Sequence, residues 1–79
     1  MYSTAKLKEI RKKTGYTIYE MADKLGITAP FYSQIENKKR RLFYDMACDI
    51  AKIFNLRPDD LFFENIEESW LAIINQFSY

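Results

Sequence analysis

Histidine is absent from the sequence, and cysteine, glycine and proline are scarce: the 79 residues include no His, one Cys, two Gly and two Pro. A zinc site built from thiolate and imidazole ligands needs several such residues, and a histidine general base is impossible. The single cysteine, Cys48, cannot form a disulfide within the chain, which favours a reducing, intracellular setting. So few turn residues disfavour a fold of many strands, because such a fold needs frequent tight turns.

A long apolar run is also missing. Residues 1–6 do not resemble a signal peptide, and no stretch is apolar enough to span a membrane, so we expect a cytoplasmic protein with no membrane partner. The paired acids Asp59-Asp60 and Glu67-Glu68 are adjacent, and adjacent side chains on a helix point about 100° apart rather than into one site. Without a Gly-rich phosphate loop, we expect no enzyme, no cofactor, no metal and no small-molecule ligand.

The charges that are present are unevenly distributed. Residues 1–41 hold ten Lys and Arg against four acids, whereas residues 42–79 hold two against seven. A basic half predicts a surface that faces a polyanion, although ordinary solvated charge gives the same count. Hydrophobic residues make up 48% of the chain, which is typical of a folded domain, and a domain this small often oligomerises.

Caps and glycines mark the first two predicted helices. An amphipathic pattern predicts a helix over residues 5–14, which Gly15 ends. Thr17 with Glu20 three residues later forms a capping box, and the helix that it opens runs to about Leu25 and ends at Gly26.

A third helix is predicted from Thr28, its cap, to about Glu36. Pro30 is tolerated because it lies in the first turn, and Asn37 is expected to adopt the left-handed turn that ends the helix. Only four residues, 25–28, separate the apolar stretches of the second and third helices. Because so tight a turn prevents antiparallel packing, the two helices must cross steeply, as in a helix-turn-helix.

Apolar spacing predicts a fourth helix from about Tyr44 to Phe54 and a short fifth from Pro58 to Phe62. The tail, residues 64–79, carries an apolar stripe at helical spacing, although residues 71–74 also fit a short strand. The stripe either folds back on its own domain or forms a two-fold interface between copies. Its members are Ile66, Trp70, Ile73, Ile74 and Phe77.

Taken in order, these segments resemble the Cro and phage-repressor helix-turn-helix family, also called the xenobiotic-response-element type. The residues that carry the resemblance lie at 7–11, 17–28, 33–37, 50–54 and 58–62, and they align without a gap over about residues 5–63. The resemblance implies an all-α, five-helix, lambda-repressor-like DNA-binding domain over residues 1–63, followed by the tail helix within residues 64–79.

The family places its third helix in the major groove of double-stranded DNA, where the N-terminal part of that helix reads bases. Gln34 is suited to pair with adenine through two hydrogen bonds, and plain solvent exposure is the alternative. The positions that match the family's base-reading residues are Thr28, Ala29, Pro30, Ser33 and Gln34.

The resemblance also implies contacts to phosphates. Thr17, Tyr19 and the amides that open the second helix would hold one phosphate. The basic loop after the third helix would neutralise others, unless it is simply solvated. Its members are Lys38, Lys39, Arg40 and Arg41.

Arg11 and Glu36 match a family ion pair that joins the first and third helices. Four positions depart from the family. One is Phe43, which stands where a capping Ser or Thr usually precedes the fourth helix. Ile18 stands where a phosphate-binding Gln is usual, and Lys38 stands where Gly is usual. Phe31 replaces a small polar residue, and it would contact a thymine methyl or ribose, pack on Tyr2 or the following loop, or bind a protein.

These features predict a sequence-specific transcriptional regulator, most simply a repressor, that binds a near-palindromic operator as a homodimer. The abundant aromatic residues, which make up 16% of the chain, favour an alternative, namely a protein-interaction module such as an antitoxin or adaptor on the same scaffold.

Overall fold

The computed structural model describes residues 3–62 and 67–76, with side chains of the second range described from Leu71 on. These ranges contain helices and no strand, so the prediction of an all-α fold is confirmed and the alternative of a strand at 71–74 is wrong. The helices are α1 (Ala5–Thr14), α2 (Ile18–Leu25), α3 (Ala29–Glu36), α4 (Tyr44–Ile53), α5 (Pro58–Phe62) and α6 (Glu67–Asn75).

Local signals set the ends of α1 and α2 as predicted. α1 ends at Gly15 with φ 83°, and α2 ends at Gly26 with φ 70°. The capping box is complete, because the Glu20 amide donates to Thr17 Oγ1 at 3.1 Å and the Thr17 amide donates to Glu20 Oε1 at 2.9 Å. The hydroxyl of Thr28 likewise caps α3.

The prediction that Asn37 takes the left-handed conformation is wrong. Asn37 has φ −93°, and its side-chain Nδ2 donates to the backbone oxygen of Ser33 at 2.9 Å. The backbone amide of Asn37 also donates to that Ser33 oxygen at 3.0 Å, a helical bond that Asn37 makes with a right-handed backbone. The reversal occurs one residue later, at Lys38, with φ 59°, which is unfavourable for a residue with a Cβ.

The core lies between α1 and the other helices. Leu25, Ile27 and Leu56 are only partly buried and pack against this core. Ile74 of the tail stripe belongs to the core, as the fold-back alternative predicts for that residue. The buried hydrophobic residues are Leu7, Ile10, Met21, Ala22, Tyr32, Ile35, Ala47, Ile50, Ala51, Phe54, Leu61, Phe62 and Ile74.

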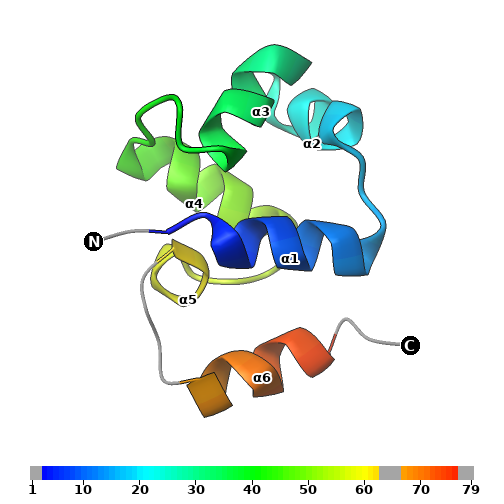
Figure 1. The fold of residues 1–79 in the computed structure, drawn as a ribbon, viewed down its shortest axis with the longest axis vertical. Helices are drawn as coiled ribbons and strands as arrows, with labels where there is room; N and C mark the ends of the chain where they lie inside the picture. Colours follow the sequence, from blue (N-terminus) through cyan, green and yellow to red (C-terminus); the bar gives the residue numbers. More distant parts are fainter. Residues whose placement is uncertain (1–2, 63–66, 77–79) are drawn as a thin grey trace.

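The tail helix and the helix-turn-helix lie at opposite ends of the molecule. Figure 1 shows α2 and α3 at one end and α6 at the other, with α1 and α5 between them. Ile74 is 4% exposed within the chain's own core, and Ile73 packs beside it. Ile66, Phe77 and the side chain of Trp70 lie outside the described residues. α6 therefore leaves α3 uncovered.

Candidate nucleic-acid interface

A tight turn joins α2 to α3. The amide of Gly26 donates to the carbonyl oxygen of Asp23 at 3.2 Å, and the amide of Ile27 donates to that of Ala22 at 3.0 Å. Ala22 is small and buried on α2, which allows the two helices to pack closely. Because the left-handed Gly26 reverses the chain within three residues, α3 leaves the turn at a steep angle to α2 (Figure 1).

The predicted base-reading residues are all exposed or partly exposed at the start of α3 and along it, although Ala29 also packs against the core. Thr28 and Pro30 are exposed, and the Thr28 hydroxyl accepts a hydrogen bond from the Phe31 amide at 3.3 Å. Ala29, Ser33 and Gln34 are partly exposed. The buried side of the helix consists of Tyr32, Ile35 and Glu36. The structure therefore brings the predicted residues together on one accessible face of α3.

A recess of about 400 Å³ lies between the N-terminal ends of α2 and α3. It is lined by Ile18 and Tyr19 from α2 and by Ala29, Pro30 and Ser33 from α3. Tyr19, a predicted phosphate ligand, is 76% exposed. Because it lines the same recess, it borders three predicted base-reading residues. Ile18 makes this lining more apolar, which a thymine methyl would match. From the sequence, Ile18 had been noted only as a departure from the family pattern, not as part of the interface.

Glu20 changes the electrostatics at the start of α2. Hydrogen bonds from the backbone amide and the hydroxyl of Thr17 lower the pKa of Glu20, so its carboxylate is charged at neutral pH. The carboxylate occupies the helix end at which a phosphate had been expected, and it would repel one. Thr17, whose hydroxyl and amide are both used in the capping box, is therefore a weaker phosphate candidate than Tyr19.

The basic loop after α3 is exposed from Lys38 to Arg41. The side chain of Arg40 contacts α3. Its Nε donates to Gln34 Oε1 at 3.0 Å, and its guanidinium carbon lies 4.3 Å from the centroid of the Phe31 ring. Of the alternatives for Phe31, the structure thus shows packing against the following loop. Arg41 instead lies over Phe43, 5.6 Å from the ring centroid. Nothing in the spacing of these residues had indicated the pairing of Arg40 with Gln34.

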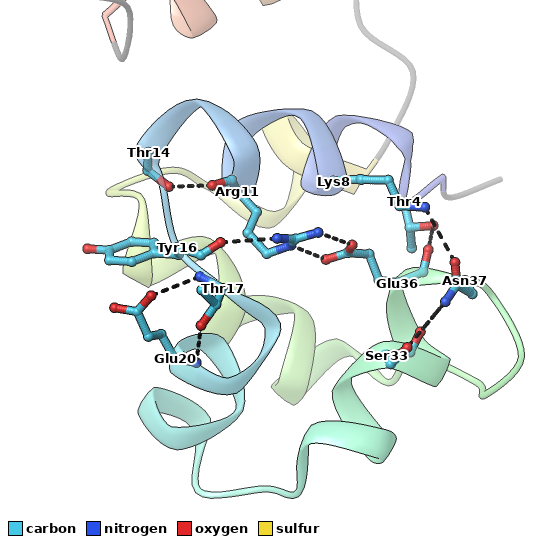
Figure 2. A network of polar contacts seen from close by, with 10 residues as sticks. All are labelled: Thr4, Lys8, Arg11, Thr14, Tyr16, Thr17, Glu20, Ser33, Glu36 and Asn37. Atoms are coloured by element: carbon cyan, nitrogen blue, oxygen red, sulfur yellow. Dashed lines mark hydrogen bonds and ion pairs between the residues drawn. The ribbon is translucent and has the colours of Figure 1, made fainter.

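Arg11 and Glu36 form a two-pronged ion pair between α1 and α3. Arg11 Nε lies 2.8 Å from Glu36 Oε2, and Nη2 lies 2.8 Å from Oε1 (Figure 2). The side chains are 11% and 2% exposed, and Arg11 Nη1 also donates to the Tyr16 carbonyl at 3.0 Å. Burial alone would raise the pKa of Glu36, but the hydrogen bonds from Arg11, the nearby Tyr32 hydroxyl and the charge of Arg11 outweigh it, so the net pKa is lowered.

Further contacts hold the C-terminal end of α3 against α1. The buried Thr4 hydroxyl donates to the Glu36 carbonyl at 2.7 Å, and Lys8 Nζ donates to Asn37 Oδ1 at 3.4 Å. Asn37 Nδ2 also approaches Ser33 Oγ at 3.3 Å, as Figure 2 shows. Sequence reasoning missed Thr4, because its partner is a backbone atom 32 residues away. These bonds fix the orientation of α3 relative to α1.

The described ranges contain no cluster of three or more Cys, Asp or Glu side chains that could hold a metal ion. Within the same ranges, no helix is both long and apolar enough to cross a membrane.

The comparisons with known proteins agree with this geometry. A helix-turn-helix family model matches residues 7–61, well over half of the chain. Two uncharacterised HTH-type transcriptional regulators of Archaeoglobus fulgidus are 35% and 31% identical over 65 residues each. These matches cover 82% of this chain and 93% and 92% of the relatives.

A propionyl-CoA carboxylase regulator of Cereibacter sphaeroides is 34% identical over 56 residues, which cover 71% of this chain but only 12% of that protein. No solved structure gave a significant match. The family model and the two regulators matched over nearly their whole length are sufficient to assign the fold and the class of function. The chain belongs to the Cro-type helix-turn-helix family of DNA-binding transcriptional regulators, which is not a family of enzymes.

Proposed function

We propose that the chain represses transcription by binding a near-palindromic operator as a homodimer, with α3 in the major groove. One observation carries this proposal: the outer side of α3 is accessible, and a run of four exposed cations follows it directly. A B-DNA major groove admits an α-helix and displays a distinct pattern of donors and acceptors for each base pair. The N-terminal residues of α3 would read that pattern, and the loop would contact the flanking phosphates.

Thr28, Pro30, Ser33 and Gln34 would make the base-reading contacts. Ala29 would contact a base from within the recess beside Tyr19. The Arg11–Glu36 pair would act at a distance from DNA, by holding α3 at a fixed angle to α1.

A homodimer is proposed because one such helix touches only a few base pairs, and two half-sites one helical turn apart supply the missing specificity. We propose that residues 1–63 bind DNA and that the outward side of the tail, residues 64–79, contributes to the contact between copies. Ile74 is covered by its own chain, so the described candidate on that outward side is Leu71, which is 50% exposed. Light scattering is expected to give a dimer mass for the wild type and a monomer mass for Leu71→Glu.

The direct experiment is selection of bound sequences from a random pool of duplex DNA, followed by affinity measurements on the selected site. We expect one near-palindromic motif, with affinity that falls steeply as salt rises, because each neutralised phosphate contributes a slope of about 0.9 in log K against log salt. Lys39→Gln should reduce that slope by about 1. Lys52→Gln is the matched control, because Lys52 is also an exposed lysine but lies on α4 in the acidic half of the chain.

A motif that also appears upstream of genes whose transcript levels rise when the protein is removed would support repression. Equal affinity for the selected site and for scrambled DNA would contradict sequence-specific binding.

A further inference from the structure

Arg40 is held against the recognition helix by two contacts of different kinds. Its Nε donates to Gln34 Oε1 at 3.0 Å, and its guanidinium carbon lies 4.3 Å from the Phe31 ring centroid. Phe31 and Gln34 are three residues apart on α3, so they are neighbours on its surface. The ring contact keeps the guanidinium close to α3, and the hydrogen bond directs its Nε at Gln34.

The backbone of the loop is anchored in the same place. The Lys38 amide donates to the Ile35 carbonyl at 3.1 Å, and the Lys39 amide donates to the Gln34 carbonyl at 2.8 Å. The left-handed backbone at Lys38 turns the chain back toward α3. Arg40 therefore follows directly after a segment that is hydrogen-bonded to the last turn of the helix, and little freedom remains in where its Cα lies.

We infer that Arg40 is a base-reading residue that recognises a guanine in each half-site, with Gln34 and Phe31 as its positioning residues; this inference rests on the proposed function. A guanidinium that donates from Nε still carries four N–H bonds on its two Nη atoms. Two of them suit the O6 and N7 acceptors that guanine presents in the major groove. Arg40 is exposed, so its Nη edge can reach a base.

This arrangement changes what is expected of Gln34. To pair with adenine, a glutamine side chain must present its carbonyl oxygen to N6 and its amide to N7 at the same time. Gln34 Oε1 is directed at Arg40 Nε instead. The structure thus favours guanine, read by Arg40, over adenine, read by Gln34, at the base pair nearest to these side chains.

Arg41 provides the matched comparison, because it is an exposed arginine in the same loop. Its guanidinium carbon lies over Phe43, which precedes α4, and not over α3. We therefore expect Arg41 to contact phosphate, which adds affinity for every sequence equally.

The test is selection from a random duplex pool with the wild type, Arg40→Lys, Arg40→Ala, Arg41→Ala and Gln34→Ala. It is followed by titration of fluorescent duplexes carrying the selected site and single base-pair changes. In the wild type, replacing the selected guanine should weaken binding by roughly 5- to 150-fold. Arg40→Lys keeps the charge but loses the paired donors, so it should reduce this ratio to about twofold or less while other positions keep theirs. Gln34→Ala should lower the ratio at the same base pair.

The control, Arg41→Ala, should weaken binding to all of these duplexes by the same factor. Circular dichroism of each variant checks that the exposed substitutions leave the fold intact. The inference is overturned if both Arg40 variants keep the wild-type motif and lose affinity uniformly, or if Gln34→Ala abolishes a preference for adenine. A wild type that selects no motif at all would overturn the proposed function itself, and the inference with it.

Discussion

Replacing Arg11 with methionine would leave the Glu36 carboxylate buried without its cation. The pair is two-pronged, with both N–O distances at 2.8 Å, and the Glu36 side chain is only 2% exposed. Removing one partner of a buried pair typically costs about 3–5 kcal/mol, because the remaining charge has lost both water and partner. A domain of this length has a free energy of unfolding of roughly 4–12 kcal/mol, so the loss is a large part of the total.

The pH dependence should reverse in this variant. In the wild type, the pKa of Glu36 is lowered below its ordinary value of 4.5, so its contribution to stability is present above that pH and is lost as pH falls through the lowered pKa. Without Arg11, burial dominates and raises the pKa of Glu36 above its ordinary value. The variant should then gain stability as pH falls toward 4.5, while the wild type gains none from this group.

Urea denaturation followed by circular dichroism at pH 7 and at pH 4.5 measures both effects. The control is Arg57→Gln, which breaks an exposed pair with Asp59 at 3.8 Å and should change stability by less than about 0.5 kcal/mol. The double variant Arg11→Met with Glu36→Gln should recover part of the loss, and it provides a reference if the single variant unfolds. A loss below about 1 kcal/mol at pH 7, with wild-type pH dependence, would refute the reasoning.

Three further changes test other parts of the fold by urea denaturation. Lys38→Gly should raise the free energy of unfolding by about 0.5–1 kcal/mol, because φ 59° strains a residue with a Cβ; no gain over Lys38→Ala would contradict this. Thr17→Ala should lower it by about 1 kcal/mol through loss of the α2 cap, and an unchanged value would mean that the capping box adds nothing. Ile74→Ala should lower it by about 2–4 kcal/mol, whereas Asn75→Ala at an exposed position of α6 should cost less than about 0.5 kcal/mol; equal small effects would show that α6 does not pack on the core.

Much of the fold could be predicted from the sequence because its signals are local. The capping box of Thr17 and Glu20 spans three residues, and the left-handed ends at Gly15 and Gly26 depend on a single residue each. Apolar spacing predicted the positions of α1, α4 and α5, and the tight turn after α2 required steep crossing. The family resemblance then placed the candidate interface on α3 and predicted the pairing of Arg11 with Glu36.

The tertiary structure decided the features that depend on segments meeting in space. Gln34 bonds to Arg40 because the loop folds back over α3, and Thr4 bonds to a carbonyl 32 residues away. The burial of Ile74 follows from where α6 docks. An apolar stripe indicates that a helix packs against another surface, but it does not specify which surface. Composition and spacing specify what each segment can do with its neighbours in sequence. Which side chains of distant segments become neighbours is determined by packing of the whole chain.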